Sequence, residues 1–140
     1  MPTVDWNVVR TAALSGLVLL VPLTLLSLWV IDDGSSSYAK LGFFGLTMFG
    51  FAAAGYGGGK LAPMAPMTHG ALGAAGTWAI IQAFGVVRRL ISGEEINVIG
   101  YPLQAMIAAG CGVFGAVFAD WVRRSGRPTS VDELRSRLPR

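Results

Sequence analysis

Three ionisable residues, Lys60, His69 and Asp120, form the one polar group in this sequence for which a shared chemistry can be argued. An amine, an imidazole and a carboxylate can exchange protons or form ion pairs, and the imidazole is the side chain whose ordinary pKa lies near neutrality. Two hypotheses follow: a Lys60–Asp120 ion pair, and a proton-sensitive role for His69. The ordinary alternative for His69 is an interfacial histidine at the start of a helix.

No set of nucleophile, base and orienting group can be recognised, because the single histidine has no evident serine or cysteine partner. Residues 55–60 read GYGGGK, but Leu61 stands where a phosphate-binding loop has a hydroxyl residue. The adjacent carboxylates of Asp32 and Asp33 provide too few oxygens for magnesium or calcium. We therefore expect no enzymatic activity, no bound cofactor and no metal site.

The composition indicates the class of protein that must position these residues. Of the 140 residues, 53% are hydrophobic and 14% are charged, whereas about a quarter are charged in a typical soluble domain. The mean hydropathy is positive. We expect an integral membrane protein whose first partner is the lipid bilayer, and we expect no nucleic acid among its partners.

Four long segments with few charges follow one another, at about residues 9–31, 41–62, 69–91 and 100–122. At about 1.5 Å per residue, each can cross a hydrocarbon core of roughly 30 Å. After them, residues 125–140 form a basic tail, in which Ser130 and Glu133 have the spacing of a capping box. The predicted fold is all-α: a four-transmembrane-helix bundle in residues 1–124, followed by a short amphipathic C-terminal helix.

The connection between the second and third segments is predicted to be short. Pro63 and Pro66 interrupt any helix there, since proline lacks the N–H that a helix interior requires. Thr68 is placed to cap the third helix with its hydroxyl oxygen.

Small residues recur every four positions in the second, third and fourth segments, which places them on one face of each helix. In lipid, such faces allow two helix backbones to approach closely. We therefore expect the second and fourth helices to pack tightly, within one chain or between chains. The predicted packing residues are Gly50, Ala54, Gly55, Gly58, Gly59, Gly70, Ala74, Ala108, Gly112, Gly115 and Ala116.

Few polar side chains lie between the ends of the predicted helices. Gln82, beside Trp78, is the best of them to line a permeation path. A hydrogen bond to a neighbouring helix is the ordinary role for such a glutamine.

The basic residues that flank the four segments predict an orientation. One side of the membrane would carry Arg10, Lys60 and the six arginines after Trp121, and the other side Lys40, Arg88 and Arg89. Eight basic residues against three place both termini in the cytoplasm. Arginine exceeds lysine, and alanine and glycine are abundant, which is typical of a GC-rich bacterial genome. We therefore expect a multi-pass protein of the bacterial inner (plasma) membrane.

A glycine-rich second helix that ends in a basic residue, followed by His-Gly at the start of the third, characterises the central half of the chain. The pattern resembles that of small four-span bacterial membrane proteins of uncharacterised function, and the resemblance implies a membrane fold but no activity. The chain lacks the membrane-embedded first-helix glutamate of small multidrug transporters and the asparagine and phenylalanine signatures of fluoride channels. The matching residues are Gly55, Gly58, Gly59, Lys60, His69 and Gly70.

Two functions are consistent with these features. The first is an accessory or scaffold subunit that packs through its glycine faces against a larger bacterial membrane complex. The second is a homo-oligomeric transporter or channel for a small solute or ion, because four helices alone enclose little space. We favour the first, since a permeation path normally contains an ionisable residue within the membrane. The expected protein partners are thus other membrane subunits or further copies of this chain.

Overall fold

The computed structural model describes residues 4–31, 34–93, 95 and 98–125, and these ranges contain four α-helices. They are α1 (Trp6–Val30), α2 (Ser37–Leu61), α3 (Pro66–Ser92) and α4 (Gly100–Ser125). Each is long and apolar enough to cross a membrane by length and composition. The prediction of an all-helical chain with four helices long enough to span a membrane is thereby confirmed. The predicted C-terminal helix lies outside the described residues and stays a prediction.

The first two helices begin at side-chain caps. The Asp5 carboxylate accepts hydrogen bonds from the backbone N–H groups of Asn7 and Val8, at the start of α1. The Ser36 hydroxyl accepts one from the backbone N–H of Ala39, at the start of α2. Both caps satisfy backbone donors that the first turn of a helix leaves without partners.

The start of α3 differs from the prediction, and the assignment of Thr68 as its cap is wrong. The helix begins with Pro66, preceded by Ala65, which makes no side-chain capping bond. Proline suits this position because its fixed φ angle is already helical and its missing N–H would have had no partner. The hydroxyl of Thr68 therefore lies inside the first turn. At the other end, Gly93 terminates α3 with a left-handed φ of 69°.

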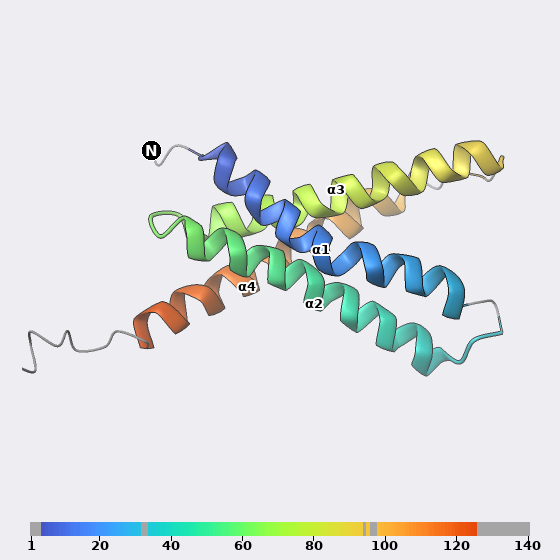
Figure 1. The fold of residues 1–140 in the computed structure, drawn as a ribbon, viewed down its shortest axis with the longest axis horizontal. Coiled ribbons are helices and arrows are strands. Elements are labelled where there is room, and N and C mark those ends of the chain that lie inside the picture. The colour runs from blue at the N-terminus through green and yellow to red at the C-terminus, as the bar shows by residue number, and fades with distance from the viewer. Residues whose placement is uncertain (1–3, 32–33, 94, 96–97, 126–140) are drawn as a thin grey trace, which may run out of the picture.

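The helices cross one another in an X-shaped arrangement (Figure 1). Both α2 and α3 contact every other helix, whereas α1 and α4 share no contact among the described residues. We call the end that carries residues 62–65 and the start of α1 the turn end, and the opposite end, with the α1–α2 and α3–α4 connections, the loop end. At the loop end, α1 and α2 lie apart from α3 and α4 (Figure 1).

Small side chains dominate the interior of the bundle. Its fully buried residues include Ala12, Ala54, Ala74 and Ala108, and the largest side chains buried completely are those of Leu20 and Thr77. Bulky apolar side chains instead cover the outside, on all four helices. This is the distribution expected in lipid, where an apolar side chain gains little by leaving the hydrocarbon and close backbone packing holds the helices together.

Candidate functional site

The closest backbone approach lies between α2 and α4. A Cβ atom on Gly55 would collide with the backbone of Gly112, and one on Gly115 would collide with the carbonyl of Ala52. Next to them, a Cβ on Gly59 would lie 2.7 Å from the Cα of Ala116. The second and fourth helices are thus in tight contact within a single chain.

The third helix joins the same region of close packing. A Cβ on Gly58 would lie 2.7 Å from the carbonyl oxygen of His69, and one on Gly70 would lie 2.9 Å from the carbonyl oxygen of Gly55. Every residue predicted to pack is buried. The small-residue faces named in the sequence analysis are therefore occupied by the other helices of the same chain.

Two packing glycines outside that set also lie in the interior. A Cβ on Gly16 of α1 would lie 2.6 Å from the Cβ of Ala54, and one on Gly73 of α3 would lie 2.7 Å from the Cβ of Ala12. A signal existed in the sequence, because Ala12 and Gly16 are four residues apart and share a helix face. The contacts of Gly16 and Gly73 include α1 in the region of close packing.

The His69 side chain is buried and connects two helix starts. Its Nε2 atom accepts a hydrogen bond of 2.9 Å from the backbone N–H of Asp5, which caps α1. Its Nδ1 atom lies 2.9 Å from the carbonyl oxygen of Ala65, the residue before α3. Because Nε2 accepts, Nδ1 carries the proton and donates it, so both ring nitrogens are satisfied in the neutral imidazole.

The predicted Lys60–Asp120 ion pair is not formed. The Asp120 carboxylate instead binds Arg123, and it binds Arg124 at 2.6 Å, both one turn further along α4. Lys60 is exposed at the end of α2. Arginines three and four residues away reach a carboxylate on the same helix face without any tertiary contact. Lys60, His69 and Asp120 share no hydrogen bond or ion pair, so the structure does not unite them in one cluster.

Gln82 connects α3 to α4. Its amide Nε2 donates a 2.6 Å hydrogen bond to Oε1 of Gln104. Nearby, the ring of Trp78 meets the ring of Tyr101 edge-on, with centroids 6.4 Å apart. Among the described residues, the indole nitrogen of Trp78 is the one buried side-chain polar atom without a hydrogen-bond partner. Gln82 thus makes the interhelical bond that was its ordinary alternative, and it also borders a groove.

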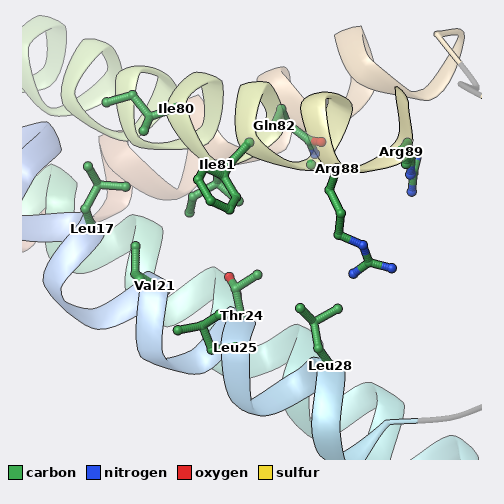
Figure 2. A pocket seen from close by; sticks show the side chains of 12 residues that line it. Leu17, Val21, Thr24, Leu25, Leu28, Ile80, Ile81, Gln82, Arg88 and Arg89 are labelled. Carbon is green, nitrogen blue, oxygen red and sulfur yellow. The ribbon is translucent and has the colours of Figure 1, made fainter. Parts of the chain in front are cut away.

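That groove runs between α1 and α3 and has a volume of about 540 Å³ (Figure 2). Aliphatic and aromatic side chains of the two helices form its walls, and polar side chains from both helices border it. The apolar walls are Leu17, Val21, Leu25, Leu28, Ile80, Ile81 and Phe84, and the polar border is Thr24, Gln82, Arg88 and Arg89.

The described residues contain no group of histidine, cysteine and carboxylate side chains that could hold a metal ion. The one cysteine, Cys111, lies between α2 and α4, with its sulfur 3.6 Å from the sulfur of Met48. The described residues thus provide close helix packing and a groove between α1 and α3.

No protein-family model matches the chain, and neither a curated protein nor a solved structure matches it. The resemblance to small four-span bacterial proteins thus depends on the residue pattern alone. Function has to be argued from the geometry.

Proposed function

We propose that this protein is a helix-packing accessory or scaffold subunit of a larger membrane complex in the bacterial plasma membrane, with both termini in the cytoplasm. The sequence supports this orientation, since eight basic residues precede or follow the helix ends that it puts in the cytoplasm and three flank the ends that it puts outside. The polar contacts described above support a structural role, because His69 and Gln82 each bond to a group outside their own helix, and Asp120 pairs with arginines of its own helix.

The observation that carries the proposal is a glycine face of α2 that has no neighbour. Towards the turn end, Met48, Ala52 and Gly55 of α2 all contact α4. Gly45 lies three residues before Met48 and seven before Ala52, and therefore on the same face of the helix. Yet a Cβ on Gly45 would meet nothing within 4 Å, and the same is true of Gly42. The α4 helix has diverged from α2 at this level (Figure 1).

These two residues, which we call the open glycines, bring no advantage to the isolated chain. Glycine in an exposed helix interior costs about 0.5–1 kcal/mol relative to alanine. It becomes favourable where another helix backbone comes close enough to gain dispersion contacts. Since the glycine faces first considered for partner binding are filled inside the chain, we place the contact with a partner helix at Gly42 and Gly45.

The test is a mild-detergent pull-down of the tagged protein from its native membrane, with the mass of the eluted complex measured. For the unaltered chain we expect a stoichiometric second protein, and for Gly45→Leu a loss of most of it. A Cβ atom at Gly45 would meet no other atom of the chain within 4 Å, so the leucine variant should keep the fold. Gly110→Leu is the matched control, because Gly110 on α4 is equally open and lies outside the proposed contact.

If Gly45→Leu retains the partner as well as Gly110→Leu does, the open glycines are not the interface. If the eluted complex contains several copies of this chain and nothing else, the second candidate, a homo-oligomeric transporter of a small solute or ion, takes precedence. The polar residues Thr24, Gln82 and Arg88 along one groove favour it. Flux into liposomes that contain the protein, compared with Gln82→Leu, then tests that activity.

A further inference from the structure

We propose that the groove between α1 and α3 binds one anionic phospholipid of the bilayer, with an acyl chain along its apolar walls and the phosphate at Arg88 and Arg89. The site is separate from the open glycines of α2, and the inference does not depend on the proposed partner. It depends on the length, the opening and the charge of the groove.

The length of the groove corresponds to one leaflet. Along α1 its walls extend from Leu17 to Leu28, which is about 16 Å at the rise of an α-helix. This is about half of a hydrocarbon core of roughly 30 Å. A volume of about 540 Å³ lies within the usual range for ligand sites, about 300–1,000 Å³. The groove can therefore take an acyl chain from the middle of the bilayer to one interface.

The groove opens onto the lipid-facing surface. Five of its apolar wall residues are exposed, with Phe84 at 79%: they are Val21, Leu25, Leu28, Ile80 and Phe84. The space arises because α1 and α3 diverge towards the loop end (Figure 1). A lipid can thus enter sideways from the membrane, without crossing the protein or approaching from water.

The charge stands at the end where a headgroup would lie. The two charged residues that border the groove are both arginines, Arg88 and Arg89. Figure 2 shows the Arg88 side chain extending from α3 towards Leu28 of α1, at the loop end of the groove. A guanidinium group binds phosphate oxygens through two parallel hydrogen bonds, which makes arginine well suited to a phosphate at the membrane interface.

The polar side chains of Thr24 and Gln82, along the walls of the groove, are hydrogen-bonded within the protein. The Thr24 hydroxyl donates to the carbonyl of Leu20 in its own helix, and the Gln82 amide donates to Gln104. They leave the inner walls apolar in effect, as an acyl chain requires.

A phospholipid fits better than a soluble anion. A phospholipid reaches the arginines from the bilayer side, and burial of its acyl chain adds a favourable apolar contribution that free phosphate lacks.

The first test changes the charge. The purified full-length protein is reconstituted in phosphatidylcholine bilayers that contain a minor fraction of phosphatidylglycerol, and the lipids that remain bound in mild detergent are counted by native mass spectrometry. We expect one retained phosphatidylglycerol, and a fall of roughly tenfold or more in its occupancy for Arg88→Gln combined with Arg89→Gln. Arg10→Gln combined with Lys60→Gln removes the same charge at the turn end and should leave occupancy unchanged.

The second test fills the groove. A side chain added at Gly85, which borders the groove, would have as its sole near contact the Gln82 side-chain oxygen, 3.9 Å from the new Cβ. Gly85→Leu should therefore occupy the groove without disturbing the fold, and it should lower phosphatidylglycerol occupancy as strongly as the double arginine variant. Gly110→Leu adds the same side chain at another lipid-facing site and should have no effect.

Three results would overturn the proposal. Equal retention of phosphatidylcholine and phosphatidylglycerol would show that lipids coat the protein without a site for an anionic headgroup. Displacement of the lipid by inorganic phosphate would show that the acyl chain is not part of recognition. A Gly85→Leu variant that keeps its lipid and loses a co-purified protein would show that the groove holds a helix instead.

Discussion

The two ends of the bundle use the same residue type, glycine, in opposite ways. Near the turn end, Gly55, Gly58 and Gly59 each lie against the backbone of another helix, where a Cβ would collide. Near the loop end, Gly42 and Gly45 of the same helix have nothing within 4 Å of a Cβ. A glycine on a membrane helix therefore does not identify a contact by itself, because the neighbouring helix must still be present at that level.

The difference follows from how the helices are tied together. Crossing helices touch over a limited length and separate on either side of it. At the turn end, residues 62–65 connect α2 to α3 directly, and His69 holds the start of α1 against the start of α3. At the loop end, the connections between α1 and α2 and between α3 and α4 are longer, and the two helix pairs diverge there (Figure 1).

The largest expected effect comes from adding a methyl group at the turn end. In Gly55→Ala the new Cβ collides with the backbone of Gly112, so α2 and α4 must move apart. Overpacking of this kind costs about 1–3 kcal/mol. We expect a clearly lower thermal unfolding temperature in mild detergent, followed by intrinsic tryptophan fluorescence. An unfolding temperature equal to that of Gly45→Ala, the same change ten residues earlier on α2, would contradict the close contact.

A smaller loss is expected when the hydrogen bonds by which His69 connects the starts of α1 and α3 are removed. His69→Ala leaves the backbone N–H of Asp5 and the carbonyl of Ala65 without their partner. Both hydrogen bonds are only partly buried, so water can replace the histidine and the cost is about 0.5–1.5 kcal/mol. The readout is amide hydrogen exchange at residues 5–8, which should become faster while exchange in α4 is unchanged. His69→Gln is the control, because its side-chain oxygen can still accept from Asp5. Equal exchange in the unaltered chain and in both variants would mean that the His69 hydrogen bonds do not hold the start of α1.

The smallest effect has the opposite sign. Gly45→Ala should raise the unfolding free energy of the isolated chain by up to about 1 kcal/mol, since alanine favours a helix and meets no neighbour there. Thermal unfolding in detergent, with no partner present, measures the change. A decrease instead would show that some part of the chain packs on Gly45 and that the loop end is more closed than described.

The general fold could be predicted from the sequence, because a run of some twenty residues with few charges has few structural options in lipid. Helix ends were harder to predict. Thr68 has the chemistry of a cap, but Pro66 begins the helix first, since proline at the first position has the required φ and no N–H to satisfy. A similar depth in the membrane predicts an ion pair between Asp120 and Lys60, whereas Arg123 and Arg124 lie closer to Asp120, on the same helix.

The spacing of small residues identified the faces that are buried but not their neighbours. The repeat of four includes Gly55 but not Gly45, whose neighbours four residues away are Leu41 and Phe49. It does not say which helix covers Gly55, because that depends on the angle at which α4 crosses α2. The groove was beyond prediction for the same reason. Leu17, Val21 and Leu28 have the appearance of ordinary lipid-facing residues until α3 is placed at an angle beside them.

The contact pattern has a further consequence, for the order of assembly. Among the described residues α1 and α4, the first and last helices made, do not touch, while α2 and α3 contact each other and both outer helices. During synthesis, α2 therefore finds α1 already in place, α3 finds both of them, and α4 finds α2 and α3. Each helix after α1 thus finds at least one of its packing neighbours already in the membrane when it emerges.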